Sequence, residues 1–284
     1  MVLESLITPR LAERRPWELF FIGIFYSTIG MFLSLWIFQE QASLVMVFLT
    51  VLACVPLMYN TMRLEEKKED VNDSAIEEFR EHWRALSFFV ALFFGFIISF
   101  ALWYVFLPPH LVESLFSSQS TTINAINAKI HSTPTGDTIT AFIANGAVFA
   151  KIFTNNVKVL FFCVFFSFFY GAGAIFILTW NASVISTAIG NFIRENLSSA
   201  LGWGYFAVIS IGFMRYMTHG IFEILAYFMG GLAGGIISVA VIRHELFSKK
   251  FRRIVFDSFD LVVLALVTLF VAALVEVYIT PLLF

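Results

Sequence analysis

The sequence predicts an all-α fold, a polytopic integral membrane helix bundle with about seven transmembrane helices. Hydrophobic residues make up 59% of the 284 residues and charged residues only 13%, with a mean hydropathy of +0.85. A soluble domain of this length could not hide so much apolar surface. Apolar stretches of about 20 residues, the length that spans a bilayer as a helix, recur along the chain. The chain is therefore predicted to be one membrane domain over residues 1–284.

Six apolar stretches are long enough to cross a membrane, and they occupy residues 17–38, 42–62, 86–107, 157–179, 220–242 and 259–280. A seventh, 201–217, is shorter. The preceding segment, 182–194, is rich in small and polar residues, and it predicts an interfacial or re-entrant helix, which is permitted at membrane depth only when protein buries it. Residues 1–15 contain acidic residues and Pro9, and no small-residue cleavage site follows the first apolar run. We expect that run to remain as a membrane span.

The placement of lysine and arginine predicts the orientation, since short cytoplasmic loops carry an excess of both. With seven spans, most basic residues fall on the side of the N-terminus: Arg10, Arg14, Arg15, Arg63, Lys67, Lys68, Arg80, Arg84, Arg194, Arg243, Lys249, Lys250, Arg252 and Arg253. Lys129, Lys151, Lys158 and Arg215 fall on the other side. With six spans, the basic segment 243–253 would lie outside. We therefore expect a cytoplasmic N-terminus, an extracytoplasmic C-terminus and a location in the cell membrane.

Two connections are polar. Residues 63–85 predict a charged cytoplasmic connection, which is either a solvated extension of the neighbouring helices or a docking surface for a cytosolic partner. Residues 108–156 predict an extracytoplasmic loop, whose Ser, Thr and Asn content favours flexibility. Cys54 and Cys163 lie inside apolar spans and predict packing rather than a disulfide or a metal site. The composition gives no support for nucleic-acid binding.

Ionisable residues near one end of several spans predict a polar cluster in the outer leaflet. Each such group costs roughly 2.5–3.5 kcal/mol on insertion scales, so it needs a partner or a function. The predicted members are Arg215, His219, Glu223, Asn155, Asn156, Lys158 and Glu276, and Asn181 is expected to cap the inner end of a span. Two interpretations stay open: ion pairs that lock the helices together, or a pocket for a lipid headgroup, an ion or a partner's membrane segment.

Glycines predict close helix packing. Gly230, Gly231, Gly234 and Gly235 form two overlapping small-xxx-small spacings, which allow backbones to approach. Gly171 and Gly173 are expected to act similarly in their span, and Gly220 follows His219 where the chain could bend.

Four motifs together carry a family resemblance. They are HGIFEILAYFMGGLAGG from His219, the pair Asn155–Asn156, the GAG…N run from Gly171 to Asn181, and VAALVEVYITP from Val271. In order and spacing the chain resembles the stage II sporulation protein M family over residues 155–281, its predicted signature core, and the first half looks like archaeal members. The resemblance implies a signature at His219, Gly220 and Glu223, with Asn155, Asn156, Asn181 and Glu276 as further recurrent polar positions.

In spore-forming bacteria, the member that this chain resembles is a scaffold that assembles with two cell-wall hydrolases. The resemblance therefore implies a non-enzymatic scaffold or anchor that binds other membrane or envelope proteins in the lipid bilayer, with self-association open. The alternative is a transporter or permease component with a polar pocket at His219 and Glu223. An intramembrane hydrolase is a third class, but one histidine beside one glutamate lacks the ligand set of a zinc protease. No catalytic residue, metal or cofactor is assigned.

Overall fold

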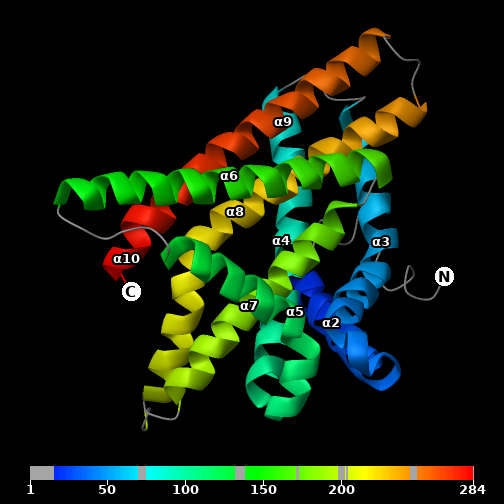
Figure 1. Cartoon of the computed structure of the whole chain (residues 1–284). Helices are drawn as coiled ribbons and strands as arrows, with labels where there is room; N and C mark the ends of the chain where they lie inside the picture. The colour runs from blue at the N-terminus through cyan, green and yellow to red at the C-terminus, as the bar shows by residue number, and fades with distance from the viewer. Residues whose placement is uncertain are drawn as a thin grey trace.

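The computed structural model describes residues 16–69, 75–131, 138–170, 173–197, 202, 204–243 and 248–283, and its regular elements in these ranges are helices (Figure 1). Seven of the described helices are long and apolar enough to cross a membrane. The predicted class, an all-α multi-pass bundle, is confirmed. The elements are α2 (Pro16–Ile37), η2 (Gln39–Gln41), α3 (Ala42–Glu69), α4 (Ala75–Phe106), α5 (Pro109–His131), α6 (Thr138–Tyr170), α7 (Ala174–Leu197), α8 (Gly204–Arg243), α9 (Lys249–Leu274), η3 (Val275–Ile279) and α10 (Thr280–Leu283).

Helices α2 and α4 run parallel and touch backbone to backbone. A Cβ atom on Gly23 would collide with the Leu92 carbonyl, and one on Gly95 would collide with the Phe20 carbonyl. Further along the pair, the Thr28 and Ser99 hydroxyls lie 3.0 Å apart. Small residues allow such an approach in a bilayer, where close packing rather than hydrophobic burial draws helices together.

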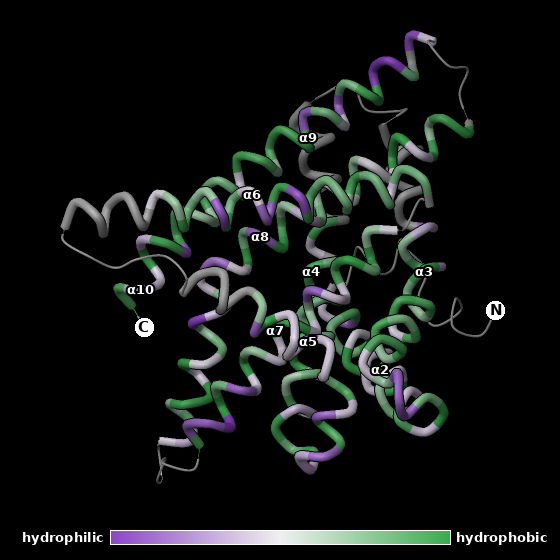
Figure 2. Tube along the Cα trace, in the orientation of Figure 1, coloured by the Kyte–Doolittle hydropathy of each residue, from purple (hydrophilic) through white to green (hydrophobic). Residues whose placement is uncertain are grey.

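The core is aromatic. Phe89, Phe93, Phe96 and Phe100 recur at helical spacing on α4 and are fully buried. Phe89 stacks on Phe228 of α8 with ring centroids 5.6 Å apart. Large apolar side chains also cover the outer faces of the helices. Figure 2 shows apolar residues along much of the membrane-spanning helices, with hydrophilic ones near helix ends and where α6 and α8 meet.

The segment 108–156 is not a flexible loop where the structure describes it, because α5 and the first half of α6 occupy it. Its hydroxyl groups fit a helix: the Thr121 and Thr122 side chains each donate to the carbonyl four residues earlier, both at 2.9 Å. The buried Gln119 amide donates to the Ser43 carbonyl and to the Ser183 hydroxyl, both at 3.1 Å. Helix α5 is thereby tied to α3 and α7. Residues 132–137 lie outside the described ranges.

The predicted bounds of the middle spans are wrong, although the predicted total of seven spans agrees with the described helices. The expected span 157–179 crosses a chain reversal, since α6 ends at Tyr170 and α7 begins at Ala174. Segment 182–194 is part of α7, which has the length of a full span rather than of a short interfacial helix. The expected spans 201–217 and 220–242 form one continuous helix of 40 residues, α8. In Figure 1 the first part of α8 runs beside α7 and the rest runs beside α9.

Arg194 is placed differently from its prediction. The guanidinium donates from Nη2 to the carbonyls of Leu107 and Val105 at the end of α4, and it lies 5.5 Å from the Tyr104 ring centroid. Because α4 is parallel to α2, this end is opposite to the start of α2. Arg194 therefore lies on the side of the bundle opposite to the start of α2. The sequence had predicted it on the same side as the N-terminus. A cation at this position satisfies carbonyls that a helix end leaves without partners.

Candidate functional site: a polar cavity inside the helix bundle

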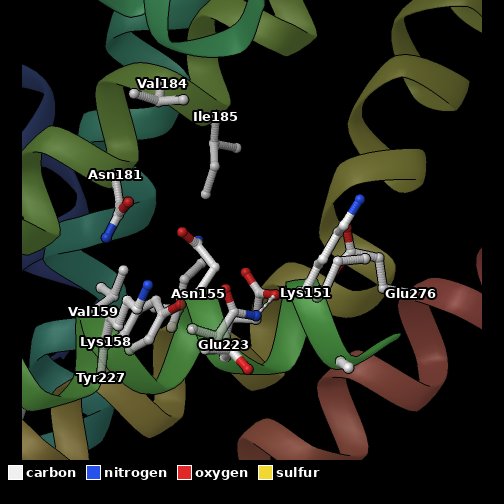
Figure 3. Close-up of a pocket in the computed structure, with 15 residues that line it drawn as sticks. Lys151, Asn155, Lys158, Val159, Asn181, Val184, Ile185, Glu223, Tyr227 and Glu276 are labelled. Atoms are coloured by element: carbon white, nitrogen blue, oxygen red, sulfur yellow. Dashed lines mark hydrogen bonds between the residues drawn. The ribbon is translucent and has the colours of Figure 1, made fainter. Parts of the chain in front are cut away.

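A cavity of about 720 Å³ lies among α6, α7, α8 and the turn η3. Figure 3 shows side chains from these elements converging on it. The lining combines charged and amide groups with aliphatic ones: Ala150, Lys151, Ile152, Thr154, Asn155, Asn156, Lys158, Val159, Asn181, Val184, Ile185, Glu223, Ile224, Tyr227 and Glu276. A concave site with a mainly apolar wall and a few polar groups is typical of a ligand pocket.

Glu223 provides the best-defined polar contact in the cavity. It stands halfway along the 40-residue α8, not at the mouth of a span as the sequence suggested. The buried Asn156 side chain on α6 donates from Nδ2 to the Glu223 carboxyl oxygen Oε1. A carboxyl group far from either helix end needs such a partner, because hydrocarbon offers no hydrogen bonds. The bond also fixes how α6 and α8 face one another at the cavity.

Glu276 reaches the cavity from a π-helical turn, Val275–Ile279, at the end of α9. Both the backbone N–H and the hydroxyl of Thr280 bond to the Val275 carbonyl, the hydroxyl at 3.1 Å. The Thr280 hydroxyl also lies 3.4 Å from Nδ1 of His219 on α8. His219 therefore contacts the turn that carries Glu276 and does not line the cavity itself. Single π turns inside α-helices occur frequently at functional sites.

One face of α6 gives the cavity a polar rim. Lys151, Thr154, Asn155 and Lys158 follow the three- and four-residue spacing of a helix face, and all four are exposed. They lie inside the part of α6 that is apolar enough to cross a membrane. Opposite them, the buried Nδ2 of Asn181 on α7 has no hydrogen-bond partner. An unsatisfied buried donor is costly, so a ligand group that accepts from it would be favoured.

The structure brings together six of the eight polar residues singled out in the sequence: Asn155, Asn156, Lys158, Asn181, Glu223 and Glu276. Asn181, expected to cap an inner helix end, instead lies inside α7 and faces the others. Arg215 is exposed and lies 5.9 Å from the Phe192 ring centroid, away from this group. Lys151 and Tyr227 were not predicted as site residues. In the sequence, the seven-residue spacing between Lys151 and Lys158 could have indicated that Lys151 lies on the same helix face as Lys158.

The glycines of α8 let two helices approach at the cavity, since Gly231 faces α7 and both Gly230 and Gly234 face α6. A Cβ on Gly231 would lie 2.7 Å from the Ala174 Cβ, and one on Gly234 would collide with the Val164 carbonyl. Gly230 faces the Leu160 side chain in the same way, and Gly235 is buried. Gly173 packs against the Phe166 carbonyl at the turn between α6 and α7, whereas Gly171 lies outside the described residues. A Cβ on Gly220 would meet only the Met217 methyl, at 3.6 Å.

The part of the chain that the structure describes holds no group of three or more His, Cys, Asp or Glu side chains placed to bind a metal ion. Cys54 and Cys163 are both buried and unpaired, as expected for packing residues.

Comparison with known proteins identifies the family. The family model described as "Stage II sporulation protein M" matches residues 85–281. An uncharacterized protein of the archaeon Methanocaldococcus jannaschii is 31% identical over 137 residues, which is 47% of this chain and 71% of that protein. No solved structure matches the chain. The matched region contains the cavity and its carboxyl groups, and the chain belongs to the stage II sporulation protein M family.

Proposed function

We propose that this protein is a non-enzymatic permease component of the cell membrane, which binds a polar ligand in the cavity between α6, α7, α8 and η3. The observation that supports this role is the position of Glu223 halfway along α8, with the cavity beside it. Ionisable groups that face a cavity at membrane depth commonly mark the path of a substrate or an ion. The unpaired amide of Asn181 and the rim of Lys158 and Asn155 supply further groups that a polar ligand would contact.

A permease exposes its binding site to each side of the membrane in turn, and cysteine labelling tests this without knowledge of the ligand. Val184 lines the cavity, whereas Phe165 on α6 is an exposed apolar residue outside it. In sealed vesicles of each orientation, a membrane-impermeant thiol reagent should label Val184→Cys from both sides and should not label Phe165→Cys. The native Cys54 and Cys163 are fully buried and should give little background. Labelling of Val184→Cys from one side only, or from neither, would contradict the permease role.

A scaffold or anchor is the second candidate, and the length of α8 favours it. Forty residues of helix measure about 60 Å, whereas the hydrocarbon core is about 30 Å thick. A scaffold would use the part of α8 that exceeds this thickness to contact other membrane or envelope proteins, or a second copy of the chain. Affinity purification from native membranes tests this role. A scaffold should retain a partner at a fixed ratio, and purification of this chain alone would count against it.

A further inference from the structure

We propose that the ligand of this cavity is a zwitterionic amphiphile whose headgroup carries a phosphate and an ammonium group, as an aminophospholipid does. The inference rests on the proposed binding function and names the class of ligand. It combines three features of the cavity: cations and amide donors on its rim, carboxyl groups in its interior, and an entrance on the face of a membrane-spanning helix.

The rim is suited to a phosphate group. Lys151 and Lys158 stand two turns apart on α6, about 10 Å along the helix axis, and Asn155 lies between them on the same face. Lysine ammonium and asparagine amide groups donate hydrogen bonds to anionic oxygens. Asn181 adds a donor with no partner on the facing helix α7. A phosphate group near Asn155 would therefore lie between two lysines, Lys151 before it and Lys158 after it along the helix.

The interior is suited to an ammonium group. Glu223 and Glu276 line the same cavity from α8 and η3, and the donor bonded to Glu223 is the neutral Asn156 amide. Ionised carboxyl groups only accept hydrogen bonds, so they are complementary to the three donors of a primary ammonium. A purely anionic headgroup would bring its charge towards these carboxyl groups, and a purely cationic one would bring its charge towards the lysines. A headgroup that carries both charges satisfies both ends.

The entrance favours a lipid over a water-soluble zwitterion. The exposed face of a membrane-spanning helix contacts lipid, and Lys158 and Asn155 lie on such a face of α6. Aliphatic side chains, Ile152 and Val159 of α6 and Ile185 of α7, line the cavity beside these polar groups. They would contact the glycerol and the first methylene groups of a lipid whose headgroup is inside. A soluble zwitterion would leave this apolar wall uncovered.

Binding of short-chain lipids to the purified full-length protein tests the inference. The probes are dihexanoyl phosphatidylethanolamine, dihexanoyl phosphatidylglycerol, which lacks the amine, and free phosphoethanolamine, which lacks the chains. Affinities are measured in detergent after delipidation, by native mass spectrometry and by thermophoresis. We expect phosphatidylethanolamine to bind at least tenfold more tightly than either other probe, the scale set by one charged hydrogen bond. Equal binding of both lipids, or tighter binding of phosphoethanolamine, would overturn the inference.

Variants locate the site. Lys158→Gln should weaken both lipids about tenfold, whereas Glu223→Gln and Glu276→Gln should remove the preference for the amine and spare phosphatidylglycerol. Lys249→Gln and Glu195→Gln, both exposed and outside the cavity lining, are the matched controls. A thermal unfolding scan confirms that each variant is folded, and Lys158→Gln at its exposed position reports binding if a carboxyl variant unfolds. Unchanged affinities in Lys158→Gln, together with an unchanged preference in both carboxyl variants, would overturn the assignment.

The result separates this inference from the permease role. Selective lipid binding with labelling of Val184→Cys from one side only would retain the lipid site and remove the permease. Labelling from both sides without lipid selectivity would retain the permease and remove the lipid.

Discussion

The Asn156 side chain on α6 donates a hydrogen bond to Oε1 of Glu223 on α8, and this bond joins two helices at the wall of the cavity. The packing of α6 against α8 and the polar chemistry of the cavity therefore depend on the same two side chains.

A double-mutant cycle on this pair should show coupling. Asn156→Leu and Glu223→Leu each remove one partner of the bond and are expected to lower the free energy of unfolding, with an interaction term of about 1 kcal/mol, as found for hydrogen bonds between membrane helices. Thermal or denaturant unfolding in detergent measures it. Asn156→Leu combined with Glu195→Gln, an exposed position at the end of α7, serves as the control and should be additive. Additivity in both cycles would show that the bond contributes no stability.

Replacing Gly234, the glycine of α8 that lies against the backbone of α6, should separate these two helices. Gly234→Ala places a methyl group against the Val164 carbonyl, and the strain should cost about 1–3 kcal/mol of unfolding free energy. Gly220→Ala on the same helix meets only a flexible methionine methyl and should cost much less. Comparing the two melting temperatures in detergent checks this. Similar melting temperatures for the two variants would contradict the close crossing at Gly234.

Removing the guanidinium of Arg194 should loosen the end of α4. In Arg194→Gln the Leu107 carbonyl loses a charged donor and the Tyr104 ring loses its cation, so we expect destabilisation by about 1–3 kcal/mol. Arg215→Gln removes an exposed arginine near an aromatic ring and provides the control, with an expected change below about 1 kcal/mol. Equal effects in the two variants would show that the contacts of Arg194 with α4 do not matter for stability.

Cysteine labelling in intact cells should reveal the orientation. Seven crossings with a cytoplasmic N-terminus place the α7–α8 connection outside and the basic α8–α9 connection inside. Asn196→Cys should therefore react with an impermeant maleimide in intact cells, and Ser248→Cys only after the membrane is permeabilised. The reverse pattern would invert the topology. The buried native cysteines should remain unlabelled in both.

The class of fold was predictable because hydropathy reports the solvent of each segment, and lipid imposes helices of a certain length. The bounds of α6, α7 and α8 were not. The run FFYGAGAIF is apolar on both sides of the chain reversal near Gly173, and a hydropathy average does not register a change of direction. The polar run Thr218–His219 looked like the end of a span, but α8 continues through it, and His219 lies beside Thr280 of the neighbouring turn.

The residues that line the cavity were more predictable than their places along the helices. Costly polar residues in apolar stretches identified Glu223, Glu276 and Asn156, since each needs a partner. Their places depended on the helix bounds, so Glu223 was expected near the start of a span rather than halfway along α8. Lys151 was missed because its helix face is recognisable only once α6 is known to begin well before Asn155.

The π-helical turn at Val275–Ile279 contains five residues, more than a turn of the preceding α-helix. It therefore accommodates one extra residue in the C-terminal helix. Deleting one residue there would let an ordinary α-helical turn replace it, and the residues after the turn would stay on the same faces of the helix. Thr280 would then stay beside His219, whereas Glu276 would lose the wide turn that carries it into the cavity. A carboxyl group in this protein is thus positioned by the length of the chain as much as by its side chain.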